Sequence, residues 1–371
     1  MGEYAQAGIN YSKIGPFKSI MQKVTKKTAA FPERYDVYVH EDIPHSHGAL
    51  WEYRGSGSHV FVQTTEGLGN LNWIAEWMYA QDPSRSYYDV IARAAALIIV
   101  IDVLAQGGMP VMWTNKVESG DSDWFTDLKR ADDYARGCIE ICSEVGMCLG
   151  QGDSSVLQYI VKPEPPIQSC PSLSGCVSGV IAPHSNMITG RRIRVDDRIL
   201  GVPTPYLHAN GVSLVIKRAL TLKDQFLTKL PNGRTLGEEA LMPIPSYVTL
   251  VEALFKNKVP LHAVIPATGG GVSKIAFDKR PLTYRITKWV NLPVIMEFML
   301  EIGVSMEDVL TTFNCGIGMY FIVPPQVVNF AISAAEAAGY KLVELGVVEE
   351  GDRRVIFGPG PKSIILPPPQ G

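Results

Sequence analysis

The sequence has little of what marks secreted, membrane or nucleic-acid-binding proteins. Six of its 371 residues are cysteines and none forms a C-x-x-C pair; a chain of this size does not need disulfides to be stable. The net charge is −3, without a long block of one sign, so the cationic face that nucleic acid or an anionic membrane requires is missing. The N-terminus lacks the apolar core of a secretory signal. We expect a cytoplasmic protein with reduced thiols and neither a nucleic-acid nor a membrane partner.

Long apolar runs are also absent. The longest extends from Ala94 to Leu104, is interrupted by Asp102, and is far shorter than the ~20 residues needed to span a bilayer. Apolar residues nevertheless make up 46% of the chain and charged residues 19%, which is enough for large cores. The length favours two domains over one.

Several common catalytic motifs are missing. The chain contains no G-x-S-x-G nucleophile turn, no Walker lysine loop and no dinucleotide fingerprint, so these three chemistries have no support. His45 and His47 have no Cys or Glu at ligand spacing, which disfavours a zinc site.

Short apolar segments alternate with helical patterns in both halves of the chain. Residues 59–65 predict a strand, and residues 88–106 predict a buried helix because apolar side chains cover nearly every side of it. The segment 162–175 concentrates Pro and Ser and predicts a domain boundary. We expect an α/β (α+β) protein with two domains, over residues 1–172 and 173–371.

The C-terminal half carries more specific local patterns. Residues 211–222 predict a helix capped by Asn210. Residues 341–350 and 353–357 flank a glycine turn and predict an antiparallel pair. The tail, residues 359–371, is rich in proline, which predicts loose attachment.

Three loops combine glycine with polar residues after apolar segments: EGLG (66–69), QGD (151–153) and TGGG (268–271). Glycines let backbone N–H groups approach a phosphate closely, and a helix N-terminus adds a favourable dipole. The same composition also makes an ordinary turn. For each loop taken singly, both interpretations stay open.

Acidic residues and one histidine accompany these loops. Glu66 and Asp153 lie in two of them, and Asp102 lies within the apolar helix. A buried carboxylate needs a cation or a donor, and magnesium on an ATP phosphate tail takes one or two carboxylates; a structural ion pair explains Asp102 equally well. His208 can contact an anionic substrate or orient a reacting group, or can be an ordinary solvated loop histidine.

The order of the motifs is more informative than any one of them. Between Tyr4 and Phe357 the chain contains, in order, YAQAGIN, TTEGLG, QGDS, PYLHANGVSLV, GEEALMPIPSYV, HAVIPATGGGV and TFNCGIGM. In this order they resemble the phosphoribosylformylglycinamidine cyclo-ligase family. LHANGVSLV, TGGG and TFNCGIGM are the most specific, and distinguish it from relatives that make selenophosphate or thiamine diphosphate or amidate the preceding purine intermediate.

The resemblance implies a homodimer whose N-terminal domains form a shared β-barrel, with a C-terminal α/β domain in each subunit. It implies that ATP and Mg²⁺ bind in a cleft lined by the glycine loops. The reaction it implies is phosphorylation of the formyl oxygen of formylglycinamidine ribonucleotide, followed by ring closure. Catalysis of this kind depends mainly on positioning and charge stabilisation.

The family roles transfer to individual residues of this chain. The resemblance gives the metal ligands Glu66, Asp102 and Asp153, and the catalytic residues His208 and Asp102. The cofactor-binding residues that it gives are Gly67, Gly69, Gly152, Asn210, Thr268, Gly269, Gly270 and Gly271.

Four positions in the N-terminal half depart from the family pattern. Leu71 stands for a lysine, Ala94 and Asn115 for aspartates, and Ile101 for an asparagine. Losing one transition-state donor can cost on the order of a hundred- to a thousandfold in rate; Lys116 is a candidate replacement for the lysine. Two alternatives to the cyclo-ligase therefore stay open: an ATP-dependent phosphoryl-transfer enzyme with another substrate, and a non-catalytic relative that binds a ligand or partner.

Overall fold

The computed structural model describes residues 9–40, 48–359 and 362–369, and the chain divides into two compact units. Unit 1 comprises Met1–Val103, Gly108–His184 and Ala240–Ser246, and unit 2 comprises Leu104–Gly107, Ser185–Glu239 and Tyr247–Gly371. The Pro-rich segment predicts a boundary after residue 172. Strand β7 (Ser172–Ile181) begins there and belongs to the sheet of unit 1, which continues to His184.

Unit 1 is built on a mixed sheet. Among the described residues its five strands are β3 (Val60–Gly67), β7, β4 (Met109–Ser119), β5 (Cys148–Leu149) and β6 (Asp153–Val156). Strands β3, β7 and β4 are antiparallel neighbours, while β5 and β6 both pair with β4 in parallel. The short strands β1 (Val37–Val39) and β2 (Trp51–Tyr53) pair with each other.

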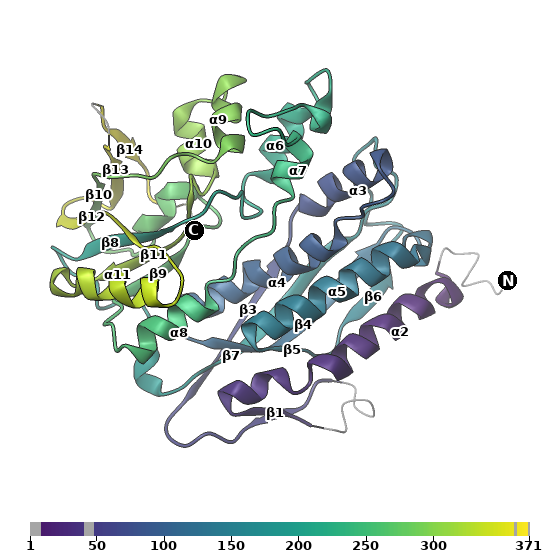
Figure 1. Ribbon diagram of the computed structural model, residues 1–371, viewed down its shortest axis with the longest axis horizontal. Helices are drawn as coiled ribbons and strands as arrows, with labels where there is room; N and C mark the ends of the chain where they lie inside the picture. Colours follow the sequence, from purple (N-terminus) through teal and green to yellow (C-terminus); the bar gives the residue numbers. More distant parts are fainter. Residues whose placement is uncertain (1–8, 41–47, 360–361, 370–371) are drawn as a thin grey trace. The chain divides into compact units, whose positions relative to one another are not determined.

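Helices cover one face of this sheet. In Figure 1, α2 (Tyr11–Thr28), α5 (Leu128–Val145) and α4 (Tyr88–Ala105) run side by side. Thr64 of β3 donates to the carbonyl of Ile99 on α4 at 3.3 Å, and Asn115 of β4 donates to the Tyr134 hydroxyl on α5 at 3.2 Å. Helix α3 (Leu71–Gln81) follows the turn after β3. No helix in the described ranges has both the length and the apolar character needed to cross a membrane.

Helix α2 is held by local signals that the opening stretch of sequence carries. The Asn10 side chain accepts from the backbone N–H of Ser12 and caps the N-terminus. Ile14, Phe17 and Val24 recur at helical spacing and are buried, and Phe17 packs edge-on against Trp124 with ring centroids 5.8 Å apart. This leaves the neighbouring stripe of α2 free to line a cavity.

Unit 2 contains a second, larger sheet. Among the described residues its seven strands are β8 (Arg198–Pro203), β9 (Ala263–Pro266), β10 (Leu282–Ile286), β11 (Ile317–Val323), β12 (Val343–Glu350), β13 (Arg354–Phe357) and β14 (Ile364–Leu366), in the order β14-β13-β10-β12-β8-β11-β9. Its helices include α6 (Val212–Ala219), α8 (Val248–Lys256), α9 (Val294–Glu301), α10 (Met306–Thr312) and α11 (Val328–Ala337), and the short α7 (Leu236–Ala240) precedes α8.

The structure confirms the mixed α/β class, the strand predicted over residues 59–65 (β3) and the helix predicted over residues 88–106 (α4). Two C-terminal predictions are wrong. Strands β12 and β13 do not form a hairpin, because β10 lies between them and pairs with both. The tail is not loose throughout, since β14 pairs with β13 at the sheet edge.

Candidate functional site

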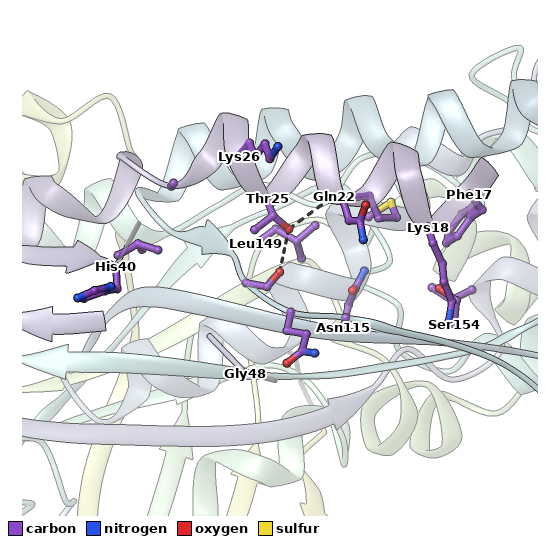
Figure 2. A pocket seen from close by; sticks show the side chains of 17 residues that line it. Phe17, Lys18, Gln22, Thr25, Lys26, His40, Gly48, Asn115, Leu149 and Ser154 are labelled. Atoms are coloured by element: carbon purple, nitrogen blue, oxygen red, sulfur yellow. Dashed lines mark hydrogen bonds between the residues drawn. The ribbon is translucent and has the colours of Figure 1, made fainter. Parts of the chain in front are cut away.

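A cavity of about 700 Å³ opens between α2 and the glycine-containing loop that joins β5 to β6 in unit 1. Its polar lining includes Lys18, Gln22, Thr25, Lys26, Asn115 and Gln151. Figure 2 shows Gln22 and Thr25 pointing from α2 into this space, and Asn115 pointing from β4 toward the helix. We call this space the α2 cavity.

Helical spacing explains why these side chains share one space. Lys18, Gln22 and Thr25 follow each other at intervals of four and three residues, which places them on one stripe of α2. The Thr25 hydroxyl donates to the carbonyl of Gly150 at 2.9 Å and so ties the stripe to the loop. In Figure 2, Lys18 extends from α2 toward Ser154 of β6.

Two glycines let the loop pass close to β4. A side chain at Gly150 would meet the sulfur of Met112 at 2.6 Å, and one at Gly152 would overlap the Asn115 side chain. The absence of a side chain at both positions therefore allows close packing, whatever else these glycines do. Gly152 also borders the α2 cavity, as the sequence predicts for a cofactor-binding residue.

A second hollow, of about 400 Å³, lies on the other side of the same loop, on the face of the sheet that points away from the helices. It shares Asn115, Gln151 and Gly152 with the α2 cavity and adds Lys116 and Asp153. The Lys116 ammonium donates to the Glu118 carboxylate at 2.6 Å. This bond, and beyond it the charges of Glu118 and Asp153, raise the pKa of Lys116, so the side chain is a fixed cation beside the loop.

The two carboxylates predicted at the ends of this sheet lie on opposite faces. Glu66 of β3 pairs with Gly175 of β7, which in turn pairs with Asn115 of β4. Asp153 of β6 pairs instead with Lys116, the residue that follows Asn115 on β4. Successive residues of a strand point to opposite faces. Strands β7 and β4 also separate β3 from β6, which places the two backbones about 14 Å apart.

Asp102 is distant from both. Val103, the next residue on α4, packs on Gly179, the β7 partner of Val62. Asp102 therefore lies level with the start of β3, about 13 Å along that strand from Glu66. The expectation that Glu66, Asp102 and Asp153 converge on one metal ion is wrong within a single chain.

Magnesium has no matching ligand set in the part of the chain that the structure describes. No group of three or more His, Cys, Asp or Glu side chains there could hold a metal ion. Among the described residues, no carboxylate lines the α2 cavity, and Asp153 is the one carboxylate lining the second hollow. Mg²⁺ on a phosphate chain takes one or two carboxylates, so the described wall of the α2 cavity does not fit it, and the second hollow offers Asp153 alone.

The EGLG turn borders neither hollow. Glu66 and Gly67 are the last residues of β3, and Gly69, with φ of +72°, makes the turn into α3. Leu71, where the resemblance implies a lysine, is the first residue of α3 and is 2% exposed. Leu71 therefore contributes a buried apolar side chain where a lysine would contribute a positive charge.

His208 of unit 2 is a buried residue. It is 2% exposed, and its Nε2 lies 3.1 Å from both the Thr204 hydroxyl and the Tyr247 hydroxyl. Burial lowers the pKa of His208 to about 3, so the ring is neutral at physiological pH. The alternative of a solvated loop histidine is wrong, and in this structure the ring orients its own loop.

Asn210 and the TGGG loop are fastened together. The Asn210 side chain donates to the carbonyl of Ala267 at 2.5 Å and accepts from the N–H of Gly269 at 3.0 Å. It does not cap α6, whose N-cap is Gly211.

The remaining residues of TGGG also have partners or close neighbours in unit 2. The carbonyl of Thr268 accepts from Lys274 at 2.5 Å. A side chain at Gly271 would overlap the carbonyl of Leu310, whereas Gly269 has open space around it and Gly270 has Pro369 as a neighbour.

Sequence reasoning missed the residues on α2. The signal was the helical recurrence of Ile14, Phe17 and Val24, which places Lys18 and Gln22 on an adjacent stripe. Two sequence features cannot be followed: His45 and His47, and all but the end of the YAQAGIN motif, lie outside the described residues.

Comparison with known proteins identifies the relatives of this chain. Residues 194–358 match the family model described as AIR synthase related protein, C-terminal domain. The phosphoribosylformylglycinamidine cyclo-ligase of Alkaliphilus oremlandii (strain OhILAs) is 31% identical over 305 residues, covering 80% of this chain and 84% of that protein. The chain belongs to the phosphoribosylformylglycinamidine cyclo-ligase family.

A second cyclo-ligase agrees with this assignment, and two solved structures of other names share the fold. The cyclo-ligase of Carboxydothermus hydrogenoformans is 30% identical over 310 residues, covering 82% of this chain and 84% of that protein. A thiamine-monophosphate kinase from Stenotrophomonas maltophilia K279a superposes with a TM-score of 0.59 at 16% identity, covering 91% and 96% of the two chains. The hydrogenase maturation protein HypE in complex with ATP gives 0.59 at 15% identity, covering 92% of each chain. The cyclo-ligase family thus shares its fold with proteins of other names, and members of the family are enzymes that use ATP.

Proposed function

We propose that the chain closes the imidazole ring of aminoimidazole ribonucleotide from formylglycinamidine ribonucleotide, with ATP as the phosphoryl donor. The relationship to named cyclo-ligases carries this proposal, because it extends over four-fifths of the chain at 31% identity. In the reaction, the formyl oxygen takes the γ-phosphoryl group of ATP and ADP is released. A nitrogen of the same substrate then attacks the activated carbon, and phosphate leaves with the former formyl oxygen.

The loop of residues 150–152 is the proposed place for the phosphate chain of ATP. It borders both hollows of unit 1, its glycines allow close backbone approach, and Lys18, Lys26 and Lys116 supply positive charge around it. These residues would hold and orient the phosphates, which is most of what phosphoryl transfer requires of a protein.

We assign positioning roles in unit 2 to His208 and Asn210. His208 fixes the loop of residues 204–211 through Thr204 and Tyr247, and Asn210 fixes the TGGG loop through Ala267 and Gly269. We propose that these two loops face the ribonucleotide substrate, as the family motifs imply.

A homodimer is part of the same proposal. Phe61, Gln63 and Thr65 of β3 point away from the helices and are exposed, Phe61 by 53%. A sheet face with such residues and no helix over it is a surface for a second copy, and pairing would form the shared barrel of the family. Light scattering would show a dimer, and Phe61→Lys would shift it toward monomer.

We further propose that the enzyme works in the cytoplasm. All six cysteines are free thiols, and burial raises the pKa of five of them, that of Cys148 to about 11. Such thiols are protonated and unreactive, as suits a reducing compartment.

The decisive test is turnover by pure protein. ADP release should depend on formylglycinamidine ribonucleotide, and aminoimidazole ribonucleotide should form in equal amount by mass spectrometry. The control omits the ribonucleotide and measures background ATP hydrolysis. ATP use without the cyclised product would count against the proposal.

A second candidate is an ATP-dependent phosphoryl-transfer enzyme with another acceptor. The observation that favours it is the neutral residue at two positions where the family resemblance implies a charge: Asn115 is an amide that is 5% exposed, and Leu71 is a core residue. A screen of acceptors for ATP-dependent phosphorylation would select this candidate if formylglycinamidine ribonucleotide is inert. Tight ATP binding with no turnover on any acceptor would select a non-catalytic relative instead.

A further inference from the structure

We infer that the α2 cavity binds the phosphate chain of its nucleotide through lysine ammonium groups and amides, without a divalent cation. The inference deepens the proposed function and rests on it for the identity of the nucleotide. It departs from the magnesium that the family resemblance implies. Three features of the structure support it: the charge of the cavity wall, its hydrogen-bonding groups and the position of the carboxylates.

Over the described residues, which exclude 41–47 between the lining residues His40 and Gly48, the wall of the α2 cavity carries cations and no carboxylate. Lys18 is half-buried and Lys26 is exposed, and both line the cavity. Within the described part of the chain, neither has an acidic group within 4.0 Å, in contrast to Lys13, Lys116 and Lys129, which do. Lysines without a carboxylate partner on a cavity wall favour an anionic ligand and repel Mg²⁺.

The hydrogen-bonding groups of the wall also suit a phosphate. Gln22 and Gln151 bring side-chain amides to the cavity, and Ser154 adds a hydroxyl beside Lys18 (Figure 2). Amide N–H and hydroxyl groups donate to phosphate oxygens. Lysine binds phosphate as a point charge, so it needs no particular geometry to contribute.

Asn115 shows how the family metal site has changed. The family resemblance implies an aspartate here, whereas this chain has an amide that donates to the Tyr134 hydroxyl and borders both hollows. The exchange removes a metal ligand and one negative charge from beside the phosphates. Glu66 and Asp153 lie on opposite faces of the sheet, so they cannot hold one cation together. The positive charges on the wall of the α2 cavity are therefore those of the lysines.

Calorimetric titration with ATP in EDTA, and again in excess MgCl₂, tests the inference. The full-length protein should bind ATP in EDTA at least as tightly as with Mg²⁺. Lys18→Gln should weaken binding in EDTA about tenfold, since a charge-assisted contact is lost, and the double variant with Lys26→Gln should weaken it further.

The matched controls are Lys23→Gln and Lys27→Gln. Both remove a lysine from the same helix, both positions are exposed, and neither lines the cavity. They should leave affinity within about twofold, because exposed charges at a distance are screened by salt. Circular dichroism of every variant shows that α2 still forms.

The outcomes separate this inference from the proposed function. ATP binding that needs Mg²⁺, or that Lys18→Gln leaves unchanged in EDTA, overturns the inference and leaves the cyclo-ligase reaction standing. If ATP binds in neither buffer, inorganic tripolyphosphate is titrated in EDTA. Lysine-dependent binding of tripolyphosphate then upholds the anion site while the ATP-dependent reaction fails, and no binding overturns both.

Discussion

Unit 1 and unit 2 use the polar residues of their candidate sites in different ways. In unit 2, His208 contacts Thr204 and Tyr247, and Asn210 joins Ala267 to Gly269, so these side chains are committed to the fold. In unit 1, Lys18 and Gln22 line a cavity instead.

The match to the C-terminal family model, over residues 194–358, falls mostly in unit 2. The signature motifs of the family are thus held in place by contacts within unit 2. These contacts limit the substitutions that the motifs tolerate. The walls of the hollows in unit 1 have fewer such limits. A relative can therefore keep the motifs that identify its family while the chemistry of its phosphate site changes.

The largest effect on stability should come from adding a side chain at Gly271 in unit 2. Gly271→Ala places a side chain against the Leu310 carbonyl at a φ of +56°, and we expect a loss of about 3 kcal/mol from overlap and left-handed strain together. The midpoint of thermal unfolding should fall by about 6–12 °C.

Gly269→Ala is the matched variant. Its φ is +67°, but it has open space around it, so the loss should be about 1 kcal/mol from strain alone. Equal losses in the two variants would show that packing against Leu310 is not what Gly271 provides.

A smaller effect should come from the pH dependence of His208. Its pKa is lowered to about 3 in the folded chain, against about 6.5 when unfolded. Between these values the unfolded chain binds the extra proton, so stability is complete above pH 6.5 and is lost as pH falls. The loss should reach about 2 kcal/mol at pH 5.

His208→Asn tests this, since Asn tolerates the positive φ at this position. Denaturant midpoints at pH 7 and pH 5 are compared for both proteins. The variant should be less stable at pH 7 but should lose about 2 kcal/mol less than the wild type on acidification. Parallel losses would mean that His208 titrates normally.

The sequence predicts structure that depends on local patterns better than structure that depends on contacts between distant residues. Strand β3 and helix α4 follow from apolar patterns of six or more residues, which tertiary contacts do not override. Helix α2 was missed because Gly15-Pro16 reads as a turn, although the structure accommodates Pro16 within the helix.

The rest depended on contacts between residues far apart in sequence. Strand β10 separates β12 from β13, and it is more than fifty residues away along the chain. The burial of His208 depends on Tyr247, and the separation of Glu66 from Asp153 depends on two intervening strands. The motif order identified the family, but it did not give the faces on which these side chains lie.

Restoring a family carboxylate should bring unit 1 closer to the family pattern. Asn115→Asp places a negative charge beside the loop of residues 150–152. Without metal this charge repels phosphate, and with Mg²⁺ it becomes a ligand. ATP affinity in EDTA should fall about tenfold, or ~1.4 kcal/mol, and added Mg²⁺ should recover it. Asn115→Ala removes the amide without adding charge, so its ATP binding should not respond to Mg²⁺.

The smallest effect should come from Asp153→Asn. Asp153 is exposed, accepts from Ser155 at 2.8 Å, and leaves Lys116 paired with Glu118, so stability should change by less than about 0.5 kcal/mol. Because Asp153 does not line the α2 cavity, calorimetry in MgCl₂ should give an ATP affinity within about twofold of wild type. A tenfold loss that appears with Mg²⁺ and not in EDTA would make Asp153 a metal ligand, and unit 1 would then keep the family chemistry as unit 2 keeps the family motifs.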